Sequence, residues 1–536
     1  MHRPGRDSRV QLPAAARRSV PYLLTIGLCA ALVGSCAVGP DFLVPAPPDV
    51  ERYSASPLPN QTVVSATTGG ASQSFAVGRD LPGEWWALYR SRHLNALIQR
   101  AIAANANLQA AQATLRQAQE NAAAQVGTLL PAIDANSSAT RQSISPAQFG
   151  GKGSPLTFNL FNATANVSYA LDVFGGKRRA VEASEAQAEN QKFQVEATFL
   201  TLTANVVTTA IQEASLRGQI KATRDIIKDE SEQLDVLRKQ FELGGVSRAD
   251  VLAQEAQLAQ TQATLPPLEK QLEQQRNLLA TLTGRFPSDA DLQAFTLASL
   301  RLPRKLPVSL PSKLVEQRPD IRAASAQLHQ ASAQIGVATA NLLPQINLTG
   351  EFGSSALQAA SLFSPQTAIW NIGASAAQPI FHGGTLIHQK RAAEAGYDAA
   401  EAQYRDTVIN AFRNVADALR AIQSDAVALR AQERATRTAS ESLTIAREQF
   451  RAGAITYLTL LNAQRTYEQA LIGLVQAQAA RYADTAALFQ ALGGGWWNRI
   501  NTGEAAATAD SGGACGNDQS LTGGGCANKE RVGGEQ

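Results

Sequence analysis

The sequence predicts a mainly α-helical protein with some β-structure, in which long coiled-coil helical hairpins are combined with four transmembrane β-strands per protomer. Three features of the 536-residue chain predict this fold class. A pattern recurs in the second half of the chain, long stretches have coiled-coil spacing, and shorter stretches alternate apolar and polar residues. The chain is therefore interpreted as a tandem duplication of one hairpin-and-strand unit rather than as several globular domains.

The repeat is carried by short landmarks. Two of them, NLQAA at 107–111 and LLP at 129–131, recur as DIRAA and LLP at an offset of 213 residues (320 minus 107). A later landmark, QFELG at 240–244, recurs as QFRAG at an offset of 209 residues (449 minus 240). The two copies therefore share one plan, with a few residues lost between the first and the last landmarks.

Each copy is expected to contain a long helix, a turn and a shorter return helix. The predicted helices are 92–128, 175–243 and 247–284 in the first copy, and 312–341, 384–452 and 456–492 in the second. Apolar residues in the long helices recur at alternate spacings of four and three, as in a coiled-coil seam. The seam residues are Phe193, Ala197, Leu200, Ala204, Val207, Ile211 and Ala214, and Val408, Phe412, Val415, Leu419, Ile422, Ala426 and Leu429. A helix of about 69 residues is roughly 104 Å long, and two shorter helices laid end to end match it.

The domain organisation follows from these elements. Residues 285–311, which are rich in proline, and the segment before residue 92 are expected to form a belt partway along the hairpins. The predicted parts are a signal peptide at 1–35, a lipidated extended segment and belt at 36–91, a first repeat at 92–302, a second repeat at 303–497, and a Gly-rich disordered tail at 498–536.

Four strands are predicted between the short and the long helices. Apolar and polar residues alternate in 161–173, 346–352 and 370–376, and a weaker strand follows Pro131. This pattern suits a membrane barrel with a wet lumen, and a soluble antiparallel sheet with one buried face is the alternative. Because a barrel needs about eight strands, an oligomer is required, either a dimer with eight or a trimer with twelve.

The N-terminus has the layout of an export signal. Arg17 and Arg18 precede an apolar stretch at 20–33, which is too short to span a bilayer as a permanent helix. The motif VGSC that follows is similar to the cleavage motif of bacterial lipoproteins. Cys36 is therefore the predicted site of a covalent lipid, and an ordinary cleaved signal with a chance cysteine is the alternative. No other cofactor is expected.

The net charge of +3 arises in this signal. Five of the 48 Lys and Arg residues and one of the 45 Asp and Glu residues lie in 1–35, so the rest of the chain has a net charge of −1. A nearly neutral chain is not expected to bind nucleic acid. Cys515 and Cys526 lie in the tail without a nearby His, so a metal site is not expected there, and either a disulfide or two idle thiols fit the sequence.

No enzymatic activity is predicted. The five His residues are dispersed, the carboxylates are scattered along helix faces, and no HExxH, GxSxG or P-loop motif is present. A periplasmic coiled-coil scaffold would also be helical and lipidated, but it would not need four strands with a lipid-suited face. A simple porin would have the strands but much less helix.

Several motifs, taken in order, resemble the outer membrane factors, a family of TolC-like efflux and secretion channels, and particularly their lipoprotein branch of NodT and OprM type. The motifs are GPDF at 39–42, EWW at 84–86, RPDI at 318–321, LP at 343–344 and residues 450–465. The resemblance implies a homotrimer with a twelve-stranded barrel in the outer membrane and a helical tunnel in the periplasm. It further implies a periplasmic adaptor protein and an inner-membrane efflux pump as partners. A type I protein-secretion channel is the alternative within the family.

The same resemblance assigns roles to the turns farthest from the barrel. Adaptor docking is expected at Gly244, Gly245, Val246, Gly453, Ala454 and Ile455. The tunnel constriction is expected at Leu458, Thr459 and Asn462, with Asp250 in the closing network. Phe450 lacks the hydroxyl, and Ile455 the guanidinium, with which some members hold the tip shut, so closure is expected to rest on packing. From the residues alone, the glycines permit the chain to reverse, and Ser247 with Asp250, or Thr456, caps the next helix.

Overall fold

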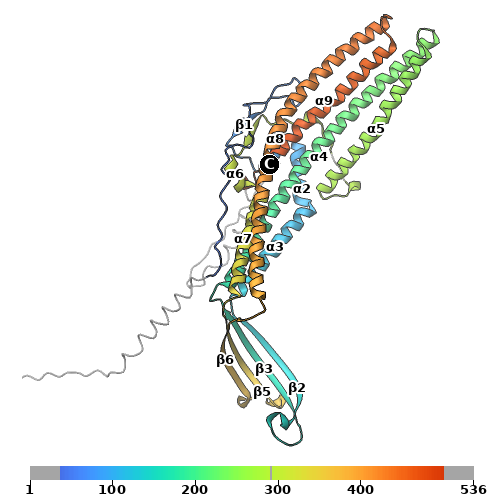
Figure 1. Cartoon of the computed structure of the whole chain (residues 1–536). Helices are drawn as coiled ribbons and strands as arrows, with labels where there is room; N and C mark the ends of the chain where they lie inside the picture. The colour runs from blue at the N-terminus through green and yellow to red at the C-terminus, as the bar shows by residue number, and fades with distance from the viewer. Residues whose placement is uncertain (1–36, 290–292, 500–536) are drawn as a thin grey trace, which may run out of the picture.

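The protein is elongated, with a β-sheet at one end and the tips of two helical hairpins at the other (Figure 1). The computed structural model describes residues 37–289 and 293–499. The predicted signal peptide, Cys36, Cys515 and Cys526 lie outside the described residues. The predicted fold class, in which long helical hairpins are combined with four strands, is confirmed.

The helices repeat in order and in length. They are α2 (Arg92–Ala104), α3 (Ala106–Gly127), α4 (Gly176–Glu242), α5 (Arg248–Leu282), α6 (Pro311–Gln317), α7 (Pro319–Ala340), α8 (Thr385–Arg451) and α9 (Tyr457–Ala491). Both α4 and α8 have 67 residues, both α5 and α9 have 35, and both α3 and α7 have 22. The starts of α4 and α8 are 209 residues apart (385 minus 176), which matches the offset of the landmarks. The predicted duplication is therefore confirmed.

The two helices predicted at 92–128 and 312–341 are each broken into two. In the first copy the break is at Asn105, whose extended backbone ends α2 and whose side chain caps α3. In the second copy the break is at Arg318, which is also extended. The residue before a proline avoids helical backbone, and Pro319 follows Arg318 directly. The prediction of single helices was therefore wrong at these two positions.

The breaks lie where the shorter helices meet end to end. Asn105 donates from Nδ2 to the carbonyl oxygen of Leu282, at the end of α5, over 3.1 Å. Arg318, the equivalent residue of the second copy, donates from Nη1 to the carbonyl oxygen of Ala491, at the end of α9, over 2.8 Å. As predicted, α5 and α3 together pack along α4, and α9 and α7 together pack along α8.

The four predicted strands form one antiparallel sheet in the order β2-β3-β5-β6. They are β2 (Ala132–Ile144), β3 (Leu156–Leu171), β5 (Gln345–Ala356) and β6 (Ala368–Ala377). β3 and β5 each pair with a strand on both sides, whereas β2 and β6 each have one edge without a strand partner in the described protomer. β3 ends at Leu171 rather than at residue 173, because the carboxylate of Asp172 instead accepts hydrogen bonds from two N–H groups in the first turn of α4.

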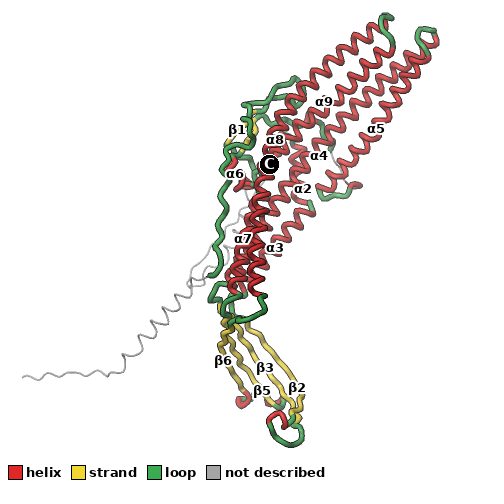
Figure 2. Tube along the Cα trace, in the orientation of Figure 1, coloured by secondary structure: helices red, strands yellow, loops and turns green. Residues whose placement is uncertain are grey.

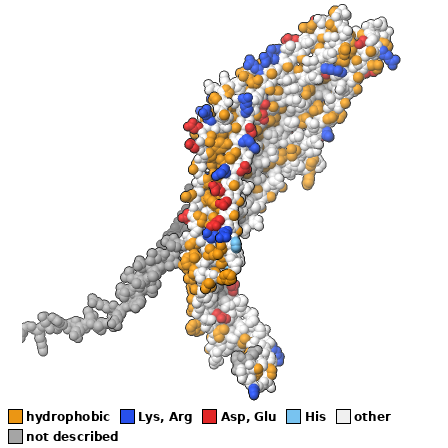
Figure 3. Space-filling view, in the orientation of Figure 1, with side chains coloured by type: hydrophobic (Ala, Val, Ile, Leu, Met, Phe, Trp, Pro, Cys, Tyr) orange, Lys and Arg blue, Asp and Glu red, His pale blue; other side chains and the backbone are white. Residues whose placement is uncertain are grey.

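One face of the sheet is apolar and exposed. The register places Phe352 opposite Trp370, and Gly350 lies between Val167 and Ile372. Trp370 and Ile372 are 75% and 80% exposed. In the view of Figure 3 the sheet shows only isolated charged side chains, whereas the helical part shows many. An apolar face of this extent without a covering layer is unusual for a protein surface in water.

A belt lies partway along the helices, as predicted. β1 (Ser74–Val77) pairs in parallel with β4 (Lys305–Val308), so the segment before α2 meets the segment before α6 (Figure 2). The aromatic residues Trp85, Trp86 and Tyr89 are buried in the main hydrophobic cluster, to which α4, α8 and α9 also contribute. Most of the predicted seam residues are also buried, and Ala197, Leu200 and Phe412 are partly buried.

The first residues of the predicted tail belong to the folded part of the protein. Asn498 donates to the carbonyl oxygen of Leu81 over 2.8 Å, and Arg499 forms an ion pair with Glu196.

In the part of the chain that the structure describes, no helix is both long enough and apolar enough to cross a membrane.

Candidate functional site

The two hairpins end in turns of the same geometry, farthest from the sheet (Figure 1). The N–H groups of Gly245 and Ala454 donate to the carbonyl oxygen five residues earlier, over 2.7 and 2.9 Å. Gly244 and Gly453 have φ angles of 75° and 73°, the left-handed backbone that glycine adopts without strain. A Cβ atom at either glycine would meet no other atom, so glycine is required there for its backbone and not for space.

The residues predicted for the constriction lie at the start of α9 and point away from the protomer core. Leu458 is 60% exposed, and Thr459 and Asn462 are also exposed. Their neighbours Leu460 and Leu461 are buried. This part of α9 therefore has one face packed on the other helices and one face free in the protomer.

A small hydrophobic cluster joins the two hairpins behind this free face. This tip cluster consists of Leu234, Leu237, Val251, Leu443, Ala446, Tyr457, Leu460 and Leu461. Val246 and Ile455, from the two turns, pack against it. The ring of Phe450 lies edge-on to that of Tyr457, with 5.5 Å between the centroids. The packing expected to hold the tip together is therefore present.

A polar network also joins the hairpins, beginning at Tyr457 of α9. The hydroxyl of Tyr457 forms a hydrogen bond with Oε1 of Gln254 on α5. The amide of Gln254 donates in turn to the backbone carbonyl oxygen of Glu230 on α4, over 2.8 Å. Gln254 and Tyr457 are both buried, so breaking these bonds would leave unsatisfied polar groups in the interior.

The network continues through Gln257 of α5. Arg465 of α9 donates from Nε to Oε1 of Gln257, and the amide of Gln257 donates to a carboxylate oxygen of Glu468, also on α9, over 3.3 Å. The hydroxyl of Thr261 lies 3.3 Å from the same amide and donates to Oε1 of Glu230 over 3.0 Å. Three helices from two hairpins thus contribute to one connected set of hydrogen bonds.

Two carboxyl groups meet inside this network, Glu230 from the first hairpin and Glu468 from the second. Glu230 is fully buried. Oε2 of Glu230 and Oε1 of Glu468 are both buried without a hydrogen-bond partner. Burial raises the pKa of both carboxyls, and burial together with the charge of Glu230 raises the pKa of Glu468 to about 7.

The two hairpins are therefore joined by hydrogen bonds as well as by apolar packing. A hydroxyl and a guanidinium are present, but they come from Tyr457 and Arg465 rather than from positions 450 and 455. Their signal in the sequence was the interruption of an apolar seam: Tyr457, Leu461, Gln464 and Glu468 have spacings of four, three and four. Polar residues at seam positions indicate a buried polar contact.

The predicted helix caps are confirmed, and they account for Asp250. Its carboxylate accepts hydrogen bonds from the N–H and the hydroxyl of Ser247, over 3.1 and 2.7 Å, and the hydroxyl of Ser247 caps α5 in return. Thr456 caps α9 by accepting a hydrogen bond from the N–H of Thr459. Asp250 makes no side-chain hydrogen bond to the second hairpin among the described residues, although its charge contributes to raising the pKa of Tyr457.

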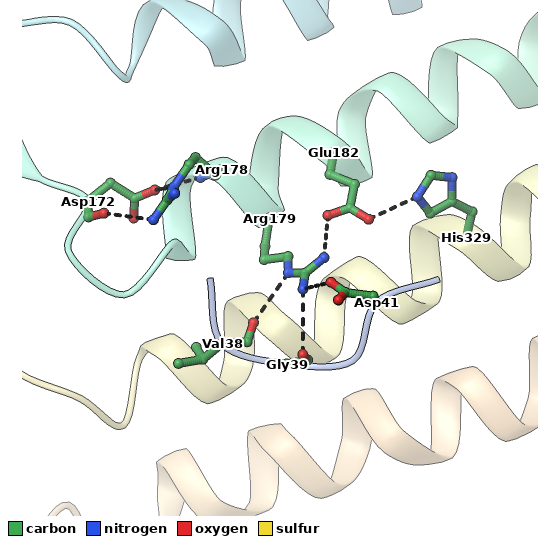
Figure 4. A network of polar contacts seen from close by, with 8 residues as sticks. All are labelled: Val38, Gly39, Asp41, Asp172, Arg178, Arg179, Glu182 and His329. Atoms are coloured by element: carbon green, nitrogen blue, oxygen red, sulfur yellow. Dashed lines mark hydrogen bonds and ion pairs between the residues drawn. The ribbon is translucent and has the colours of Figure 1, made fainter. Parts of the chain in front are cut away.

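At the other end of the helices, the segment after the predicted lipidation site is clamped onto α4 (Figure 4). The buried Arg179 forms ion pairs with Asp41 at 2.6 Å and with Glu182 at 2.7 Å. Glu182 also forms a hydrogen bond with Nε2 of His329 on α7, over 2.9 Å, and the ring of Phe42 stacks on His329. The GPDF motif is therefore held by both α4 and α7.

This clamp fixes the first described residue at the junction of sheet and helices. A Cβ atom on Gly175, the residue before α4, would lie 2.6 Å from Cα of Ala37. The N–H of Val38 donates to the carbonyl oxygen of Phe174 over 3.0 Å. Ala37 and Val38 therefore lie beside the start of α4, next to the last residues of β3.

The face of the sheet opposite the apolar one contains a continuous polar row. Asp134 lies opposite Asn166, Asn166 lies opposite Glu351, and Glu351 lies opposite Asn371, so the row crosses all four strands. The sequence pattern predicted a polar face but not this alignment, which depends on the register. The row places two carboxyl groups and two amides at one level of the sheet.

The described residues contain no arrangement that suggests a metal centre. Within residues 37–289 and 293–499, no group of three or more His, Cys, Asp and Glu side chains could hold a metal ion.

A second carboxyl pair lies near the belt, where burial and then the neighbouring Asp484 of α9 raise the pKa of Asp425 of α8 to about 7. Both members of that pair belong to the second hairpin.

The chain is similar to known proteins over most of its length. It matches the family described as outer membrane efflux protein over residues 97–285 and 310–494. It is 30% identical over 447 residues to the pyoverdine export outer membrane protein OpmQ of Pseudomonas putida, covering 82% of this chain and 94% of that protein. It is 26% identical to the probable outer membrane lipoprotein SilC of Salmonella typhimurium, covering 88% of this chain and 98% of that protein.

A solved structure gives the same result for the fold. The outer-membrane channel OprN superposes with a TM-score of 0.77 at 27% sequence identity, covering 86% of this chain and all of that chain. The hairpins, the sheet and the belt are thus those of an outer-membrane channel that extends into the periplasm. The chain belongs to the outer membrane efflux protein family and is the outer-membrane channel of a tripartite efflux system.

Proposed function

We propose that three copies of the chain form a passive conduit with a twelve-stranded barrel and a helical tunnel. The observation that carries this proposal is the sheet, which has two unpaired edges, one apolar face and one polar face. Pairing β2 of one copy with β6 of the next removes every free edge, turns the apolar face to lipid and encloses the polar face. Three copies of α4 and α8, each about 100 Å long, continue this lumen into the periplasm.

The tip of the hairpins is the proposed gate. Gly244, Gly245 and Val246, with Gly453, Ala454 and Ile455, form the proposed docking surface for a periplasmic adaptor protein. The free face of α9 supports the placement of Leu458, Thr459 and Asn462 in the constriction. Leu458 and Asn462 are one helical turn apart, so three-fold symmetry would create an apolar ring next to a neutral polar ring. Asp250 supports the gate indirectly, because it fixes the start of α5.

A lipid on Cys36 is the proposed anchor to the membrane. The clamp formed by Arg179 supports this role, because it holds the neighbouring residue 37 beside the end of β3. The relative SilC is described as a lipoprotein. Metabolic labelling with palmitate should label the wild-type protein and a Cys515→Ala control but not Cys36→Ala. Equal labelling of the Cys36→Ala variant would contradict the assignment.

The cargo is supplied by the partners in this proposal. The channel performs no catalysis, so the energy for transport comes from an inner-membrane pump. The adaptor connects the channel to this pump. The similarity to a pyoverdine export protein favours small molecules over the alternative cargo, the proteins of a type I secretion system. Co-purification with an adaptor and a proton-driven pump would support small-molecule efflux, whereas co-purification with an ATP-driven secretion transporter would support the alternative.

The oligomer can be tested by electrophoresis of the membrane-extracted protein. The channel should migrate as a trimer-sized species without heating and as a 56.8 kDa chain, less its signal peptide, after heating. A closed barrel resists detergent until it is heated because all its strand edges are paired. Migration as a monomer under both conditions would favour a periplasmic scaffold.

A further inference from the structure

The contact between Glu230 and Glu468 has a feature that the helical fold does not require. Two buried carboxyl oxygens, one from each hairpin, face each other without any other hydrogen-bond partner. The remaining oxygens of the two groups accept hydrogen bonds from Thr261 and Gln257. Two ionised carboxylates in this position would repel each other in a medium of low dielectric constant. One proton between the facing oxygens converts the repulsion into a hydrogen bond.

The duplication shows that the pair is a specific addition. The residue equivalent to Glu230 in the second copy is Ala439, and the residue equivalent to Glu468 in the first copy is Ala259, at the helix offset of 209 residues (439 minus 230, and 468 minus 259). The same hairpin plan therefore folds with alanine at either position. A buried carboxyl pair costs stability relative to alanine. The fold alone therefore does not explain the pair, and a use for its protonation state does.

We propose that Glu230 and Glu468 share one proton that latches the second hairpin to the first, so that the tip is closed while the proton is bound and loosens when it is lost. This inference rests on the proposed role of the tip as the gate. The pair lies 12 residues before the end of α4 (242 minus 230) and 11 residues after the start of α9 (468 minus 457), about 17 Å behind the turns in each case. A change in repulsion there acts directly on the hairpin contact.

The charged groups near Glu230 and Glu468 are few, so the charge of the pair depends mainly on whether the shared proton is bound. Arg465 of α9 is the cation that acts on both carboxyls, and it favours their ionised forms. Two ion pairs lie in the same region: Arg238 with Glu255 of α5 at 2.8 Å, and Arg447 of α8 with Asp229 of α4 at 3.7 Å. The phenol of Tyr457, whose pKa is raised by burial, stays neutral throughout the range of interest.

The direction of the pH effect follows from the raised pKa values. The unfolded carboxyls titrate near 4.5, whereas Glu468 in the folded protein titrates near 7. The folded tip therefore binds more protons than the separated tip between these values, and its stability falls as the pH rises through this interval. The latch is complete at acidic pH and is lost above about pH 7.

The test is the closed-state conductance of the purified full-length channel in planar bilayers between pH 5.5 and 8.5. The wild type should show a severalfold rise with a midpoint near pH 7. Glu468→Gln should show a low conductance at every pH, because its amide donates permanently to Oε2 of Glu230 while its carbonyl still accepts from Gln257. Glu230→Gln should behave in the same way, which guards against a folding defect in one variant.

The matched control is Asp425→Asn, which removes a carboxyl of similar pKa from the pair inside the second hairpin. It should keep the wild-type pH profile. A wild-type conductance that does not change with pH would overturn the latch, as would a Glu468→Gln profile identical to that of the wild type. In both cases the channels still conduct, whereas a failure of the proposed channel function would show as bilayers without conductance steps.

Discussion

The two hairpins of the protein have the same backbone but different chemistry at their contact. Their helices have equal lengths, and both turns contain a left-handed glycine. The polar residues that join them are not duplicated. Residues of the network and their equivalents at an offset of 209 are Glu230 and Ala439, Gln254 and Ala463, Thr261 and Ala470, Arg465 and Ala256, and Glu468 and Ala259.

This difference indicates that the duplicated plan builds the tunnel wall, whereas specific polar residues determine how the hairpins meet. A contact between identical faces would place like side chains together. Here Tyr457, Arg465 and Glu468 form hydrogen bonds with Gln254 or Gln257 of the other hairpin. Alanine lies at the site equivalent to each of the five network residues named above. The hairpins are therefore distinguishable, which favours one alternating arrangement around a symmetric tunnel.

The largest expected effect comes from Tyr457, which has no aromatic equivalent in the first hairpin. Tyr457→Ala removes a buried ring of the tip cluster and its hydrogen bond to Gln254, and it should cost about 3 to 5 kcal/mol of local stability. The equivalent residue of the first hairpin, Arg248, is exposed, so Arg248→Ala should cost less than about 0.5 kcal/mol. Hydrogen exchange at the first turns of α5 and α9 measures both. Similar protection in the two variants would contradict the asymmetry.

The constriction gives the next comparison, within one helix face. Leu458→Ser should enlarge the leak conductance severalfold, because an apolar ring excludes water and a hydroxyl ring does not. Asn462→Ala, one turn away, should change it little. Bilayer recordings in which both variants conduct like the wild type would remove Leu458 from the gate.

The sheet should control the ion selectivity of the channel, whereas the tip should control its closed-state conductance. Asp134 and Glu351 would contribute six carboxylates to one ring of a trimeric barrel, which favours cations. The double variant Asp134→Asn, Glu351→Gln should lower the cation-to-anion permeability ratio at unchanged closed-state conductance, measured as the reversal potential in a KCl gradient. If the tip variant Leu458→Ser changed this ratio as strongly, the division between the two ends would be wrong.

The smallest effects concern the caps of the return helices. Ser247→Ala breaks a reciprocal capping box and should cost about 1 kcal/mol, while Thr456→Ala breaks a single cap and should cost less. Hydrogen exchange of the first turn of each helix compares them. Equal losses would indicate that the hydrogen bonds between Ser247 and the carboxylate of Asp250 add nothing to the cap of α5.

The sequence predicted the long elements well because their ends carry local signals. Glycines at 175, 244, 384 and 453 bound α4 and α8, and the observed ends differ from the predicted ones by a single residue. The break at Arg318 also had a local signal in Pro319, whereas the break at Asn105 depends on its contact with Leu282, far away in sequence.

The site was harder to predict than the fold. The turns and caps are local, and they were predicted. The network of Glu230, Gln257 and Glu468 depends on which faces of three helices meet, and the row from Asp134 to Asn371 depends on strand register. Comparison with other family members directed attention to positions 450 and 455, although the hydroxyl and the guanidinium lie at 457 and 465.

The central claim is that this chain forms a trimeric channel closed at the hairpin tips. Single-channel recording of the unheated, trimer-sized wild-type protein in planar bilayers tests it most directly. We expect discrete conductance steps that are small at acidic pH and larger above about pH 7, where Glu468 loses its proton. A trimer-sized protein that inserts into the bilayer and gives no steps at any pH would contradict it.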